Sequence, residues 1–153
     1  MTKQEIKDLC KALAQTYVEA GTVTIVQKEF FSPSGCTKEP HKIFVFGDNT
    51  MRVGNGGQAC IRFCINSYGI ATKIAPGIND WDYFDDSIST LGAIFNDISY
   101  LVYQCKLRKT KFLVFPAEGL GTGLSDMPNK CPESFKIMNE CLDNIFGTNF
   151  SKE

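Results

Sequence analysis

Two short, wholly apolar runs separated by a long stretch of helical periodicity constrain the fold of this chain most strongly. They are IFVF at 43–46 and FLVF at 112–115, and both have the length of a strand that is buried on both faces of a sheet. The first run is expected to stop at Gly47. Segment 22–27 is short and rich in β-branched residues, and 70–74 follows a turn, so each predicts a further strand.

Apolar residues recur every three or four positions around these strands, which is the pattern of amphipathic helices. The helical segments are 6–17, which Gly21 can terminate, and 57–67, 88–105 and 135–145. Prolines and a glycine should keep the connection 30–41 irregular. The alternation predicts an α/β fold, specifically a three-layer α/β/α sandwich around a mixed central sheet, in a single domain over residues 1–153.

Length and charge exclude several classes of function. A chain of 153 residues has the size of one domain, and 43% hydrophobic residues are enough to form its core. The formal net charge is −1, so we expect no binding to duplex nucleic acid and none to a membrane surface. Neither a secretory signal nor a membrane-spanning segment is expected, because no apolar run is long enough. A small ligand or a protein partner fits this balance better.

Seven cysteines, an odd number without a CxxC pair, predict reduced thiols and a cytoplasmic protein. Cys60 and Cys64 are four residues apart, but with His41 as the only histidine they are predicted to pack in the core rather than to hold a metal. For Cys36, which lies in the connection 30–41, a reactive thiol remains an alternative. No metal site, no cofactor and no histidine-based triad is predicted.

Each apolar strand runs into a glycine-rich loop, and the two loops should lie at the same edge of the sheet, beyond the carboxyl ends of the strands. Glycines that lack Cβ atoms let a ligand approach the backbone, and a helix beginning near Gly57 would add its positive end. A pair of such loops suits a diphosphate. Neither loop is a P-loop or a GxGxxG fingerprint. The loop residues predicted to bind phosphate are Gly54, Gly56, Gly57, Gly119, Gly121, Thr122 and Gly123.

The segments IFVFGDNTMRVGNGGQACIR and FPAEGLGTGL resemble the macrodomain pattern, in which a strand ends in an asparagine and a second loop binds phosphate. A group of small, uncharacterised bacterial and phage proteins shares the strand-FGDN, GxGGQA and GTGL layout. The likeness covers roughly residues 43–125 and leaves the helix at 1–20 outside. It implies an ADP-ribose-binding fold, with Asn49 orienting the distal ribose. Asn55 interrupts the glycine run, and Glu118 and Gly119 stand where a macrodomain typically has Ile-Ser, so the class of ligand is better supported than its identity.

Other side chains near these loops are candidates for ligand contact, each with a structural alternative. Asp48 and Asn49 could position ribose hydroxyls or form a turn. Arg52 could counter phosphate charge or remain solvated, and Lys73 could reach phosphate or snorkel. Trp81, in an aromatic and acidic segment, could stack on a base or anchor a long loop. Gly47 and Gln58 complete the predicted binding residues.

The expected function is binding of an ADP-ribose-type or cyclic nucleotide. If the protein is an enzyme, it would hydrolyse a bond at the distal ribose, with Asn49 and Asp48 positioning sugar and water and Glu118 as the base. A rival is a protein that sequesters or senses a nucleotide signal without changing it, and the likeness to phage proteins makes an anti-defence role conceivable. A protein-interaction module with purely structural glycine loops is a third possibility.

Overall fold

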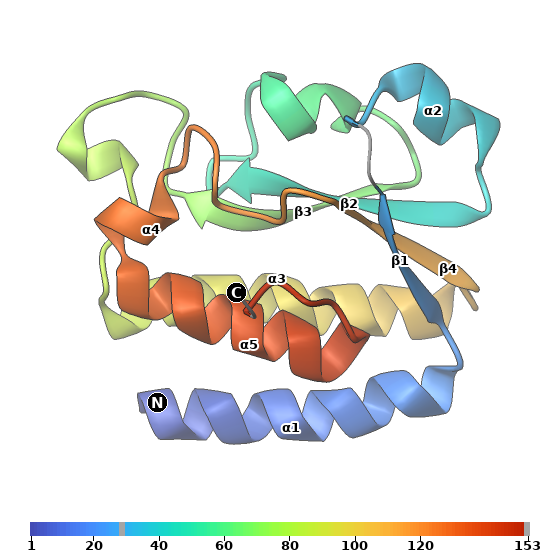
Figure 1. The fold of residues 1–153 in the computed structure, drawn as a ribbon, viewed down its shortest axis with the longest axis horizontal. Helices are drawn as coiled ribbons and strands as arrows, with labels where there is room; N and C mark the ends of the chain where they lie inside the picture. Colours follow the sequence, from blue (N-terminus) through green and yellow to red (C-terminus); the bar gives the residue numbers. More distant parts are fainter. Residues whose placement is uncertain (28–29, 152–153) are drawn as a thin grey trace.

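The computed structural model describes residues 1–27 and 30–151, and it is built on a four-stranded sheet in the order β1-β4-β2-β3 (Figure 1). All neighbouring strands are parallel. The prediction of a mixed sheet is therefore wrong, because every connection crosses back to the edge from which the previous strand began. The strands are β1 (Val23–Gln27), β2 (Lys42–Asn49), β3 (Ser67–Lys73) and β4 (Phe112–Pro116).

The long helices all lie on one side of the sheet, as Figure 1 shows. α3 (Ile88–Leu107) and α5 (Pro132–Phe146) lie against the strands, and α1 (Lys3–Ala20) packs on those two helices, farther from the sheet. The opposite face carries only short elements, α2 (Pro33–Lys38) and the 3-10 helix η1 (Gly57–Ile61). The fold is therefore α/β as predicted, but the expected helical layer on the second face is reduced to single turns and loops.

The three long helices match the periodicity of the sequence. α1 begins where the Thr2 hydroxyl accepts a hydrogen bond from the Glu5 amide at 3.1 Å, and it ends at Gly21, which adopts a left-handed conformation with φ of 70°. Two further short elements were not expected, α4 (Met127–Lys130) and the 3-10 helix η2 (Asp80–Asp82). None of the described helices is long and apolar enough to cross a bilayer.

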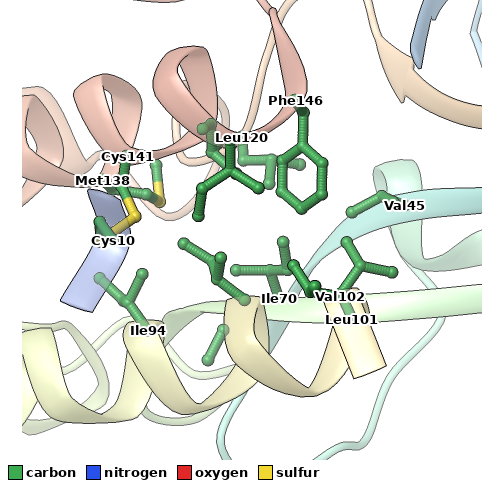
Figure 2. Close-up of a cluster of buried hydrophobic side chains, with 14 of the residues drawn as sticks. Cys10, Val45, Ile70, Ile94, Leu101, Val102, Leu120, Met138, Cys141 and Phe146 are labelled. Carbon is green, nitrogen blue, oxygen red and sulfur yellow. A yellow bond between two sulfur atoms is a disulfide. The ribbon is translucent and has the colours of Figure 1, made fainter. Parts of the chain in front are cut away.

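Alternate residues of β2 pack into two separate hydrophobic cores, one on each face of the sheet. Ile43 and Val45 join the main core with α3 and α5, whereas Phe44 and Phe46 point to the other face and pack with α2 and η1. Figure 2 shows part of the main core, where Val45 and Phe146 approach one another between the sheet and the helices. This two-sided burial confirms the prediction drawn from the IFVF run.

The segment 57–67 is not the predicted helix. After η1 the chain continues through turns, and two of its apolar residues, Phe63 and Ile65, are 84% and 87% exposed. The apolar composition resembled a helical stripe, but only part of it faces the core, so little burial is available to stabilise a longer helix. The predicted phosphate contact at a helix N-terminus loses its basis, because five residues of 3-10 helix carry little macrodipole.

Two other boundaries differ from the predictions. β2 does not stop at Gly47 but continues to Asn49, because Gly47 and Asp48 still pair with β3. The connection 30–41 is not wholly irregular, since the Ser32 hydroxyl caps α2 by accepting a hydrogen bond from the Gly35 amide at 3.1 Å.

A disulfide joins Cys10 of α1 to Cys141 of α5, so the prediction of seven reduced thiols is wrong for this pair (Figure 2). The two Cα atoms are 5.7 Å apart although 131 positions separate the residues in sequence. Such a spacing carries no signal of pairing, because only the packing of α1 against α5 brings the residues together. The other five cysteines are free.

Candidate functional site

The candidate site is the carboxyl edge of the sheet, where the segments following β2, β3 and β4 meet. Parallel strands place the ends of all three at one edge. One side chain, Gln58 of η1, ties the segments after β2 and β4 together. Its Oε1 accepts a hydrogen bond from the Gly47 amide at 2.8 Å, and its Nε2 donates to the Gly119 carbonyl at 2.8 Å and to Glu118 Oε1 at 3.1 Å. The two predicted phosphate loops are thus neighbours, one glutamine side chain apart.

Asp48 is buried and engaged by two arginines. Arg62 contacts both of its carboxylate oxygens, at 2.5 and 3.0 Å, and Arg52 approaches it at 3.4 Å. The Arg62 guanidinium also donates to the Gly54 carbonyl at 2.6 Å, so this ion pair anchors the glycine loop after β2 to the strand. A carboxylate whose oxygens are engaged in this way has little capacity left for ribose hydroxyls.

Arg52 bridges two carboxylates. Its second guanidinium nitrogen contacts Asp97 of α3 at 2.6 Å, and the other oxygen of Asp97 accepts a hydrogen bond from the Ala71 amide of β3 at 2.7 Å. Burial alone would lower the pKa of Arg52, but the hydrogen bond and charge of Asp97, together with Asp48, outweigh it and raise that pKa. The predicted phosphate-binding arginine therefore already has two anionic partners.

Asn49 closes the turn after β2 with its own side chain. Its amide nitrogen donates to the Val53 carbonyl at 2.8 Å, and its Oδ1 accepts from the Met51 amide at 3.1 Å. This is the structural alternative considered for an asparagine after a strand, an Asx-type turn. Both polar atoms of the Asn49 side chain therefore already serve the local backbone.

Glycine is required within the loop after β4. Gly121 has φ of 82°, and a Cβ atom there would collide with the side chain of Met127. The Thr122 hydroxyl donates to the Glu118 carbonyl at 3.0 Å, so it stabilises the turn. Gly56 and Gly123 differ from Gly121, because a Cβ atom at either would meet nothing within 4 Å and neither has a positive φ.

The backbone amides of these loops are the free polar groups at this edge. Within the described parts of the chain, the N–H groups of 54–58 and 120–124 donate no hydrogen bond to protein acceptors. Leu120 and Gly121 are nevertheless buried residues. A buried amide without an acceptor costs about 1–3 kcal/mol, so an acceptor supplied by a ligand would be favourable.

Glu118 is exposed and has a single side-chain hydrogen bond, that from Gln58. The cation partner considered for it, Lys73 or Arg52, is not seen, since neither forms an ion pair with it among the residues described. It therefore remains the one predicted catalytic carboxylate without a neutralising partner in the described structure.

Lys73, at the end of β3, is only 7% exposed and points to the segment after β3. Its ammonium donates to the Gly77 carbonyl at 2.5 Å and lies 4.3 Å from the centre of the Tyr83 ring. Lys130 of α4 lies 4.6 Å from the same ring. Burial lowers the pKa of Lys73, although Asp82 acts in the opposite direction.

Trp81 lies in η2 and is 73% exposed, so it does not anchor its loop by burial. The loop is instead held by Asp82, which is buried and accepts a hydrogen bond from the Asn79 amide at 3.0 Å. Ile78 and Leu124, on the segments after β3 and β4, are also more than four-fifths exposed. The indole is available to stack on a ring.

Three residues of this edge were missed by the sequence interpretation: Arg62, Asp97 and Lys130. Arg62 carried a signal, since a charged residue inside the apolar segment ACIRFC must either be exposed or find a buried partner. Asp97 was a polar interruption of the helical stripe at 88–105.

No cluster of metal ligands is present within residues 1–27 and 30–151. A hollow of about 340 Å³ lies away from both loops, beside α2, and is lined by residues that include Phe31, Cys36 and Phe44.

A family model matches residues 24–141, which include β2, β3, β4 and nearly all of β1. The chain belongs to DUF7831, a family of unknown function. The DUF7831 match contains both glycine loops and the ion pairs behind them, and it leaves the whole of α1 outside. No curated protein matches the chain, and no solved structure matches it either.

Proposed function

We propose that this DUF7831 protein binds an ADP-ribose-type nucleotide at the carboxyl edge of its sheet, with the diphosphate on the backbone amides of the two glycine loops. The observation that carries the proposal is the set of unpaired N–H groups on 54–58 and 120–124, which Gln58 holds side by side. Consecutive amides in glycine-rich turns form a concave anion site. The resemblance of these segments to macrodomain loops supports the same class of ligand.

Three side chains complete the proposed site. The ammonium groups of Lys73 and Lys130, both close to the Tyr83 ring, supply positive charge. Among the described residues, Lys73 forms no ion pair within 4 Å, and Lys130 has only a contact to Asp80 at 4.0 Å. Trp81 offers an exposed indole on which a base can stack. The arginines behind the loop are a support for the backbone rather than phosphate ligands, because their charges are already matched by Asp48 and Asp97.

Binding without turnover fits the geometry best. Asp48 and Asn49 were candidates for positioning sugar and water, yet their polar atoms are taken by Arg62, Arg52 and the local turn. We therefore favour a protein that sequesters or senses its nucleotide. Hydrolysis at the distal ribose is the second candidate, and the observation in its favour is the exposed, unneutralised carboxylate of Glu118 beside the loop.

A melting-temperature screen with recovery of the ligand tests this proposal. The purified protein is heated with ADP-ribose, its cyclic isomers, NAD, AMP and cyclic dinucleotides, and each ligand is then recovered for mass analysis. We expect an ADP-ribose-type compound to raise the melting temperature, because a ligand that binds only the native state stabilises it by mass action. Recovery of the ligand intact supports sequestration, and a cleaved product supports hydrolysis. The absence of any shift near millimolar ligand would contradict the proposal.

A further inference from the structure

Three thiols meet on the face of the sheet opposite the long helices, in and beside α2 and η1. Cys36 lies in α2, and Cys60 and Cys64 lie in and just after η1. All three pack in the smaller core that contains Phe44 and Val114. Cys36 is 1% exposed, whereas the other two are partly exposed. The family description and the proposed nucleotide site assign these thiols no role.

The contacts of the sulfur atoms fix the partly exposed thiols against α2. Cys60 Sγ donates to the Phe31 carbonyl at 3.3 Å, and Cys64 Sγ donates to the Pro33 carbonyl at 3.8 Å. Pro33 is the first residue of α2 and Cys36 is the fourth, so Cys64 lies within one helical turn of Cys36. Both partly exposed thiols therefore lie against the segment that leads into α2 or against its first turn, on the side of the sheet where Cys36 is buried.

We propose that Cys36 and Cys64 form a reversible disulfide when the protein meets a peroxide. The Cys64 thiolate attacks one oxygen of the peroxide, which forms a sulfenic acid and releases the other oxygen as hydroxide. The Cys36 sulfur then attacks the Cys64 sulfur, the S–S bond forms and the S–O bond breaks. The leaving hydroxide takes the Cys36 proton to form water. In total, two thiols lose two electrons and one peroxide is reduced to two waters.

The two cysteines have different roles in this reaction. Burial raises the pKa of the Cys36 thiol to about 12, and the nearby Cys64 and Cys60 thiols add to the rise. Cys36 is therefore protonated at neutral pH and shielded from the peroxide. The partly exposed Cys64 is then the thiol that reacts with the peroxide first. The resulting bond would fasten the segment after η1 onto α2.

Peptide mapping after peroxide treatment tests the proposal. Trypsin cleaves after Lys38 and Arg62, so the three thiols fall in three different peptides and each pairing gives a distinct linked mass. We expect the peptide containing Cys36 to become linked to the peptide containing Cys64, and alkylation of both residues after unfolding to be lost. A thiol reductant should restore it. The Cys10–Cys141 link, which is present before treatment, shows in the same digest that disulfide-linked peptides are recovered.

Two matched variants make the result decisive. Cys64→Ser alters a partly exposed position, and it should abolish the link. Cys60→Ser alters the neighbouring thiol and should leave it intact. The proposal is overturned if Cys36 is found linked to Cys60 in the wild type, if Cys36 still loses alkylation in Cys64→Ser, or if the Cys36–Cys64 link is lost in Cys60→Ser. It is equally overturned if Cys10–Cys141 is recovered while Cys36 and Cys64 stay fully alkylated, as the buried thiols Cys105 and Cys131 should.

Discussion

Asp48 shows how the role of a single residue depends on partners that are remote in sequence. Directly after an apolar run, an aspartate is equally compatible with ligand contact and with a turn. The structure instead buries it against Arg62, fourteen positions further along the chain, and Arg52, which reaches on to Asp97. These pairings depend on how β2, η1 and α3 pack together, and no local spacing reveals them. Glycine positions were easier to interpret, because the need for backbone freedom is local.

The pair of Asp48 and Arg62 leads to a stability prediction. Their side chains are 3% and 10% exposed, so Arg62→Met leaves a buried carboxylate whose remaining partners are the Asn49 amide, at 2.8 Å, and the longer contact to Arg52. We expect the free energy of unfolding, measured by chemical denaturation, to fall by about 3–5 kcal/mol. Lys3→Met is the control, since it removes an exposed ion pair with Glu133 and should cost less than about 1 kcal/mol. Equal losses of unfolding free energy in the two variants would contradict a stabilising role for the buried pair of Asp48 and Arg62.

At the scale of elements, strong periodicity identified the strands and the long helices, whereas short elements escaped it. A helix such as α3 repeats its apolar stripe over 20 residues, but η1 has five residues and α4 has four. Their conformations depend on contacts with distant segments. The turn after α5 is another example. Its Asp143 accepts hydrogen bonds from the Thr148 hydroxyl at 2.6 Å and from the Phe150 amide at 2.8 Å, which places the Phe150 ring behind Gly119.

The Asp143 turn predicts a dependence of stability on pH. Burial alone would raise the pKa of Asp143, but the hydrogen bonds from Ser151, Thr148 and the Phe150 amide outweigh it and lower that pKa below its ordinary value of 3.8. The carboxylate therefore contributes stability above that value, which is lost as the pH falls through the lower pKa of the folded state. Unfolding free energies of the wild type and Asp143→Asn should differ most near neutral pH and converge in acid. A difference that does not change with pH would contradict this assignment.

For the whole molecule, the sequence alone predicted the α/β class but not the direction of the strands or the distribution of the helices. The direction of a strand depends on where its connection returns the chain, and connections of similar length permit either outcome. The sequence did not indicate where α1 packs either. This helix packs on α3 and α5 rather than on the sheet, and the Cys10–Cys141 disulfide ties it there (Figures 1 and 2).

The disulfide closes a loop that contains most of the chain, which predicts a global effect. The paired variant Cys10→Ser and Cys141→Ser should lower the free energy of unfolding by about 2–5 kcal/mol, because the unfolded chain regains the entropy that the link removes. Denaturation with and without a thiol reductant supplies the comparison. The reductant should destabilise the wild type and leave the paired variant nearly unchanged. A wild type that is insensitive to the reductant would show that the link contributes nothing to stability.

The proposal of a nucleotide site on the two glycine loops is the central claim for the whole molecule, and calorimetric titration of matched glycine variants tests it most directly. Gly56→Val and Gly123→Val each add a side chain over the exposed amides, at positions where a Cβ atom meets nothing within 4 Å, so both variants should fold. Gly92→Val, on α3, has the same open surroundings and is the control. With ADP-ribose as the titrant, we expect wild type and Gly92→Val to bind alike, and both loop variants to bind at least about tenfold more weakly, a loss of 1.4 kcal/mol or more. Undiminished binding by both loop variants, or no binding by the wild type, would contradict the account.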